Sequence, residues 1–144
     1  MEKKLKHLEM IQGIINRLST NSFLLKGWTV VLMSALFALA AADGRRMFVL
    51  LACVPAFVFW GLDGFYLHEE RVYRRLYDYV RELNEDAIDF SMDTKAAREL
   101  EANADGRTRG AWFAACFSKT LLPFHGVLIV AIAGVVYMHL SKGG

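Results

Sequence analysis

Apolar and polar segments alternate along the chain, and three of the apolar segments are long. Residues 23–42 carry a single charge, at Lys26, and residues 47–67 carry one as well. Residues 121–138 carry none if the histidine among them is neutral. About 20 residues of α-helix cover the roughly 30 Å hydrocarbon core of a bilayer. The pattern therefore predicts three transmembrane helices, and Lys119 and Pro123 mark the entry to the third.

The polar segments also keep a helical spacing of apolar residues. In residues 2–21 these positions recur at steps of three and four: Leu5, Leu8, Ile11, Ile14, Ile15 and Leu18. In residues 68–110 a similar spacing is kept by Val72, Leu76, Tyr79, Leu83 and Phe90. A single apolar stripe is typical of a surface helix rather than a membrane span. We expect an amphipathic helix first and, after the second span, a helical arm; Asp93 or Thr94 would cap a short helix through Asn103.

These elements give four segments in an all-α, helical integral membrane protein. They are a cytoplasmic amphipathic helix (1–22), a transmembrane hairpin (23–67), a cytoplasmic helical arm and loop (68–110), and a third transmembrane helix with a short outer tail (111–144). Asp43-Gly44-Arg45-Arg46 reads as the tight turn of the hairpin. An odd number of crossings would place the two ends of this chain on opposite sides of the membrane.

Composition agrees with this class. The 144 residues are 55% hydrophobic and only 22% charged, which is too apolar for a soluble domain of this length. The net charge of +2 gives no global field that would favour nucleic acid or acidic substrates. Cys53 and Cys116 lie in apolar runs, away from metal-ligand spacing, so we expect neither a metal site nor a disulfide framework.

The basic residues predict an orientation, because cytoplasmic loops are enriched in Lys and Arg. Fourteen of the 17 basic residues fall on the side that holds segments 1–22 and 68–110, and the other side has Arg45, Arg46 and Lys142. The N-terminus and the arm are therefore predicted to be cytoplasmic, in a bacterial inner membrane.

Lys26 and Asp63 are the most informative charges, because an ionisable group within a span is costly without a partner or water. They are equally far from the centre of the 43–46 turn, so a hairpin places them at the same depth. One interpretation is a salt bridge that fixes the register of the hairpin, with Lys26 otherwise snorkelling to the headgroups. The other is a ring of charge at the mouth of an oligomeric pore.

Small residues recur every four positions on the first span, at Ser34, Ala38 and Ala42. Such residues let helix backbones approach closely in membranes. They predict helix packing, within one chain or between subunits. Three helices are too few to enclose an aqueous path, so transport would require a homo-oligomer, with a tetramer favoured.

An arginine cluster lies on the arm, interleaved with tyrosines. Its members are Arg71, Arg74, Arg75 and Arg81, with Tyr73, Tyr77 and Tyr79 between them. Attraction to anionic lipid headgroups accounts for the cluster in one interpretation. In the other, it binds an anionic nucleotide or oligonucleotide signal, because guanidinium forks and aromatic faces suit such ligands. Neighbouring acidic residues dilute the positive charge.

No pattern in the sequence indicates catalysis. The four histidines, His7, His68, His125 and His139, are scattered. No nucleophile with a matching base and no phosphate-binding glycine loop is visible. We therefore expect a protein that is not an enzyme and has no cofactor.

Three stretches support a resemblance. They are residues 21–28 (NSFLLKGW), 59–67 (FWGLDGFYL) and 74–81 (RRLYDYVR). They look like segments of small bacterial membrane proteins. The layout resembles the SLATT-type membrane effectors and is similar to that of the Hailong-type membrane effector. In those proteins a cytoplasmic helix precedes a transmembrane hairpin that continues into a long helix. The resemblance covers about residues 1–90, and the third span departs from the two-span pattern.

The resemblance implies an oligomeric pore-forming or membrane-disrupting effector in anti-phage defence. Its cytoplasmic arm would sense a nucleotide or nucleic-acid signal or a partner protein. A rival interpretation is a non-catalytic anchor or accessory subunit of a larger membrane complex. A holin is a third, although holins place few residues outside the bilayer.

Overall fold

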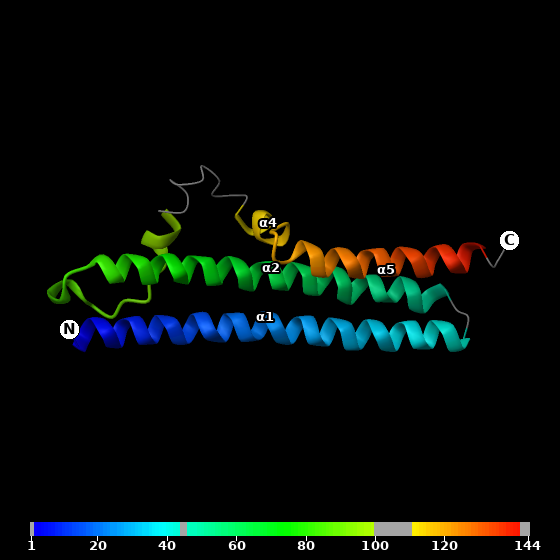
Figure 1. The fold of residues 1–144 in the computed structure, drawn as a ribbon, viewed down its shortest axis with the longest axis horizontal. Helices are drawn as coiled ribbons and strands as arrows, with labels where there is room; N and C mark the ends of the chain where they lie inside the picture. Colours follow the sequence, from blue (N-terminus) through cyan, green and yellow to red (C-terminus); the bar gives the residue numbers. More distant parts are fainter. Residues whose placement is uncertain (1, 44–45, 100–110, 142–144) are drawn as a thin grey trace. The chain divides into compact units, whose positions relative to one another are not determined.

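A computed structural model describes residues 2–43, 46–99 and 111–141 of the chain (Figure 1). The elements are α1 (Glu2–Asp43), α2 (Arg46–Glu82), a 3-10 turn η1 (Glu85–Ala87), α4 (Ala111–Cys116) and α5 (Leu122–Ser141). Residues 95–99 are also helical, and none of these described residues is in a strand. The all-α expectation is confirmed.

α1 joins the amphipathic segment and the first apolar segment into one helix of 42 residues. No proline interrupts the sequence of this helix. Two threonines that could compete with the backbone instead bond back to their own helix. Thr20 donates to the carbonyl of Asn16 at 2.8 Å, and Thr29 donates to that of Leu25 at 2.7 Å.

α2 likewise runs from the second apolar segment into the polar arm, as the spacing predicts, and it contains Pro55. It ends at Glu82, so Leu83 and Phe90, which follow the helical spacing, lie beyond it. Phe90 has a φ of 57°, in the left-handed region that a helix excludes. Tyr79 is 43% exposed while Val80 is buried, so the inward face of the arm is shifted by one residue.

The segment after α2 is held by side chains that accept backbone N–H bonds. Asp89 Oδ1 accepts from Ser91 N, and Asp93 Oδ1 accepts from Lys95 N, both at 2.9 Å. The carbonyl of Thr94 accepts the first helical bond, from Arg98 N at 2.8 Å. Both residues expected to start this short helix therefore contribute to its beginning. The end expected at Asn103 lies outside the described residues.

The third apolar run contains two helices. α4 ends at Cys116, and α5 begins at Leu122, close to the predicted entry. The carbonyl of Ser118 accepts from Leu121 N at 3.2 Å and from Leu122 N at 2.9 Å, which closes the turn between them. Pro123 lies in the first turn of α5, where a helix has no partner for the N–H that proline lacks.

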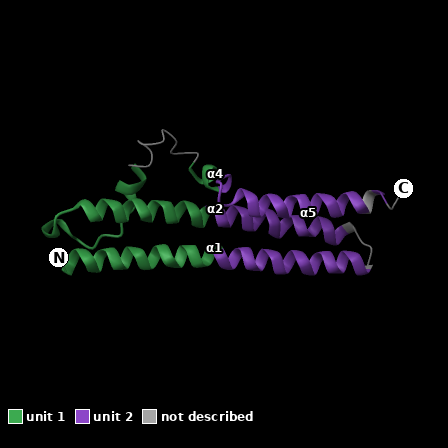
Figure 2. Ribbon diagram, in the orientation of Figure 1, with its two compact units in different colours: residues 1–22, 65–115 green, residues 23–64, 116–144 purple. Residues whose placement is uncertain are grey.

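The chain forms two compact units, coloured separately in Figure 2. Unit 1 comprises Met1–Ser22 and Phe65–Ala115, and unit 2 comprises Phe23–Gly64 and Cys116–Gly144. The core of unit 1 consists of Ile11, Ile15, Val72, Leu76, Val80 and Ala97. The core of unit 2 consists of Met33, Ala56 and Ile132, one residue from each of α1, α2 and α5.

Two helices among the described residues, α1 and α2, are long and apolar enough to cross a membrane by length and composition. The apolar part of α5, Leu122–Met138, is somewhat shorter. The all-helical class is thus shown, whereas three membrane spans remain a prediction.

Candidate functional site: a buried carboxylate shared by three helices

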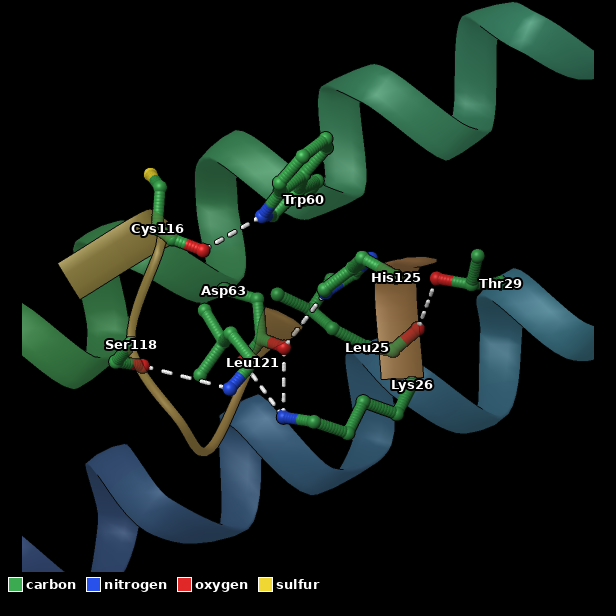
Figure 3. A network of polar contacts seen from close by, with 9 residues as sticks. All are labelled: Leu25, Lys26, Thr29, Trp60, Asp63, Cys116, Ser118, Leu121 and His125. Carbon is green, nitrogen blue, oxygen red and sulfur yellow. Dashed lines mark hydrogen bonds and ion pairs between the residues drawn. The ribbon is translucent and has the colours of Figure 1, made fainter. Parts of the chain in front are cut away.

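Asp63 is the centre of the polar contacts in unit 2 (Figure 3). Its side chain has no exposed surface, although its neighbours along α2 are apolar or glycine. Lys26 of α1 places Nζ 2.8 Å from Oδ1 and 2.6 Å from Oδ2 of this carboxylate. The structure therefore brings together the two charges that are equally far from the 43–46 turn and that the sequence places at the same depth. Lys26 keeps 23% of its side chain exposed.

His125 is a second partner of the same carboxylate, and the sequence did not single it out. Its Nε2 lies 3.0 Å from Asp63 Oδ2, and its side chain is 2% exposed. Because an ionised carboxylate only accepts hydrogen bonds, Nε2 carries the proton. The sequence could have indicated His125, because it is the one ionisable group in the apolar run 121–138 apart from Tyr137. We call Lys26, Asp63 and His125 the three-helix clasp, because they come from α1, α2 and α5.

Trp60 shields the clasp and extends it toward α4. Its ring stacks on that of His125, with centroids 5.6 Å apart and 11° between the planes. Its Nε1 donates to the carbonyl of Cys116 at 2.9 Å. That carbonyl belongs to the last residue of α4, where a helix leaves acceptors without partners. Trp60 therefore satisfies a helix end as well as covering the imidazole.

Gly64 allows α2 and the end of α4 to approach each other closely. A Cβ added at Gly64 would overlap Sγ of Cys116 and would lie 3.4 Å from its Cα. Cys116 is buried, and both cysteines are free thiols. The residue next to the central carboxylate therefore has a steric reason to be glycine.

The clasp joins three helices through one carboxylate. Here the imidazole meets Asp63 on one side and the aromatic rings of Trp60 and Phe124 around it. The carboxylate is balanced by one ammonium and receives a further donor from the imidazole. Removing Lys26 or His125 would leave the buried carboxylate of Asp63 with one partner fewer, which is costly.

The small residues of the first span do not pack within the chain. Ser34, Ala38 and Ala42 are all exposed. The buried residues of this part of α1 are Thr29, Met33 and Ala40. The predicted small-residue row therefore lies on a surface of unit 2 that the chain's own helices leave largely open.

The arginines of the arm differ in their partners and in their exposure. Arg74 pairs with Glu70 at 2.8 Å and Arg81 with Asp78 at 3.8 Å, one helical turn away in each case. Arg71 and Arg75 are half-buried. Arg74 also lines a hollow of about 270 Å³ with Gln12, Ile15, Tyr77 and Asp78.

Unit 1 contains a second set of contacts that the sequence did not predict. Residues 83–91 are tied to the start of α1 by three hydrogen bonds. Lys3 N donates to Glu85 Oε1 at 3.2 Å, Lys4 Nζ donates to the carbonyl of Leu83 at 2.8 Å, and His7 Nε2 donates to that of Ser91 at 3.0 Å. We call residues 83–94 the strap.

The helix that comes after the strap is fixed to α2. Arg98 Nη2 reaches both carboxylate oxygens of Glu69, at 2.7 and 2.9 Å, and Nη1 lies 3.4 Å from His68 Nε2. Contacts of this kind join residues about 30 positions apart, so spacing rules that work within a helix do not reveal them.

No protein-family model matches the chain, and comparisons with curated proteins and with solved structures find no match either. The resemblance to SLATT-type effectors therefore stays a prediction.

Proposed function

We propose that this chain is an integral membrane protein whose unit 2 lies in the bilayer, with α5 as the third span, and whose unit 1 lies in the cytoplasm. The observation that carries this is the inverted polarity of unit 2. Lys26 and Asp63, the two charges within its apolar segments, meet in the clasp, whereas many of its large apolar side chains are exposed. Those more than half exposed include Phe23, Trp28, Val31, Leu50, Phe57, Val127 and Val130.

Low burial distinguishes these helices from the core helices of a soluble protein. In the most apolar window, 17% of α1 and 28% of α2 are buried inside the structure. A core helix would be mostly buried, and apolar patches this large are rare on soluble monomers. The excess of basic residues on the side of unit 1 supports a cytoplasmic location for it in a bacterial inner membrane.

The function that we propose for this membrane protein is that of an oligomeric pore-forming or membrane-disrupting effector. Met33, Ala56 and Ile132 pack between the three helices of unit 2, so a conducting path would have to form between protomers. The open row of Ser34, Ala38 and Ala42 offers a surface for close contact between copies. A tetramer is the assembly that we favour.

Unit 1 would receive the signal that opens the pore. The resemblance suggests a nucleotide or nucleic-acid signal, or a partner protein, in bacterial anti-phage defence. Symmetric assembly would multiply the local charge of the arm arginines and so raise their attraction for an anionic ligand. Such binding should weaken with salt.

Three measurements test the proposal. A C-terminal reporter that is active only in the cytoplasm should stay silent, because three spans place that end outside. The mass of the particle in nanodiscs should be a multiple of the protomer mass. Induced expression should lower the signal of a membrane-potential dye. A monomeric mass would remove the pore, and an active reporter would remove either the third span or the orientation.

An accessory membrane anchor is the alternative function. Unit 2 has a packed core and a satisfied clasp within one chain, so it needs no second copy to be complete. An anchor would leave the membrane potential unchanged on expression and would co-purify with a soluble partner through unit 1.

A further inference from the structure

Unit 1 contains a cavity at the meeting point of α1, α2 and the strap. It measures about 390 Å³, within the usual range for small-molecule sites. It is lined by His7, Leu76, Tyr79, Val80, Leu83, Ala87, Asp89, Ser91, Asp93, Lys95 and Ala96. The arm arginines are not among these residues, so the cavity is separate from the arginine-bearing surface of α2.

His7, in the wall of the cavity, has an unmet acceptor. The residue is 1% exposed, and Nε2 must carry a proton because the carbonyl of Ser91 can only accept. Nδ1 is buried and, among the residues that the structure describes, has no hydrogen-bond partner. In neutral histidine this nitrogen is a bare lone pair, and a buried acceptor without a donor is unfavourable.

The carboxylates of the cavity have different partners. Asp93 is balanced by the ammonium of Lys95, 3.5 Å away. Asp89 is exposed and accepts from the backbone N–H of Ser91, a donor without a charge. Leu76 and Val80 of the unit 1 core add an apolar wall. The cavity therefore presents acceptors, one net negative charge and an apolar surface.

We propose that this cavity binds a small amphipathic amine, a cationic molecule with N–H donors and a compact apolar body. Its ammonium group meets Asp89 and supplies the donor that the His7 side of the wall lacks, and its apolar body lies against Leu76 and Val80. A metal ion fits less well, because no group of three or more His, Cys, Asp or Glu side chains suited to one occurs in the described part of the chain.

The site would connect a ligand to the two helices of unit 1 and to the strap between them. His7 belongs to α1, Leu76 and Val80 belong to α2, and Asp89 belongs to the strap. An occupied cavity therefore stabilises the strap in the position that it has here. This consequence for gating rests on the proposed function, whereas binding itself does not.

A matched set of probes tests the ligand class. Cyclohexylamine, cyclohexanol and cyclohexanecarboxylate share one ring and differ in head group, which is cationic, neutral or anionic at neutral pH. Binding to the full chain in zwitterionic nanodiscs is measured by saturation-transfer NMR, with empty nanodiscs as the blank. We expect the amine to bind about tenfold more tightly than the carboxylate, because a charge-assisted hydrogen bond is replaced by repulsion. Absence of amine binding, or equal binding of the carboxylate, would overturn the proposal.

Substitutions then test whether the amine binds in this cavity. D89N should weaken the amine about tenfold and leave cyclohexanol nearly unchanged. D78N removes the same charge from the exposed face of α2 and should have no effect. H7Q keeps an amide N–H for the carbonyl of Ser91 and replaces the Nδ1 acceptor by an amide oxygen at a different position. It should therefore weaken the amine while the strap stays protected in hydrogen exchange. Equal effects of D89N and D78N would count against the cavity.

The two proposals fail separately. Amine binding that persists in a monomeric, non-conducting protein would leave the cavity assigned and remove the pore. A conducting oligomer that ignores the amine, with or without Asp89, would remove the cavity assignment and leave the pore.

Discussion

Units 1 and 2 use their charged residues in opposite ways. In unit 2 the polar contacts converge on one carboxylate without exposed surface, which joins three helices. In unit 1 the ion pairs lie on the surface: the side chains of Arg74, Arg81 and Arg98 are 62%, 63% and 44% exposed. Solvent screens exposed pairs, whereas a buried charge that loses its partner has no water to replace it. Similar distances therefore imply different energies in the two units.

The largest loss of stability is expected when one partner of the clasp is removed. D63N keeps an acceptor for His125 but leaves the ammonium of Lys26 without a counter-charge. We expect a loss of about 3 kcal/mol in the free energy of unfolding, at the lower end for buried pairs, because Lys26 can reach solvent. K26M instead leaves the carboxylate of Asp63 with the hydrogen bond from His125 but without the ammonium of Lys26. Unfolding in mixed micelles would measure both.

The double variant K26M/D63N separates a pair from two independent residues. It removes both charges and keeps the hydrogen bond from His125, so it should be less destabilised than either single variant. Additive losses would show that Lys26 and Asp63 act independently.

The second prediction concerns the steric fit of Gly64, the residue next to Asp63, rather than a charge. G64A should destabilise unit 2 by about 1–3 kcal/mol, because its Cβ would overlap Sγ of Cys116. Adding C116A removes the sulfur and should recover most of the loss. G27A is the matched control, since a Cβ there meets nothing within 4 Å and alanine favours a helix. Equal effects of G64A and G27A would contradict the close approach.

Local periodicity and hairpin symmetry were the parts of this structure that could be predicted from the sequence. The long apolar runs became α1, α2 and α5, and the equal distance of Lys26 and Asp63 from the turn was enough to place them together. Both inferences need only the helical repeat and one tight turn.

The features that the sequence could not predict depend on packing between distant segments. The place of His125 beside Asp63 requires the position of α5 against the hairpin, which no short connection fixes. The strap departs from the helix at Leu83 although the apolar spacing continues, because capping and turn contacts of Asp89 and Asp93 replace the helical bonds. The exposure of Ser34, Ala38 and Ala42 likewise depends on which face of α1 the other helices cover.

The smallest expected effect compares two arginines of unit 1. Arg98 forms a bidentate pair with Glu69 and joins the helix at residues 95–99 to α2. Arg74 pairs with Glu70 within α2. R98A should cost about 1 kcal/mol and R74A about 0.3–0.5 kcal/mol, the usual values for exposed pairs of these two kinds.

Hydrogen exchange resolves this difference better than global unfolding does, because regions with few buried contacts open locally. Only Ala97 of the 95–99 helix contributes to the unit 1 core, so Arg98 is a large part of what holds this helix on α2. R98A should therefore speed amide exchange at residues 95–99 and leave that of unit 2 unchanged, while R74A should alter neither. If R98A also loosened the clasp around Asp63, the charges of the two units would be coupled, and the screened surface of unit 1 would not be energetically separate from the buried centre of unit 2.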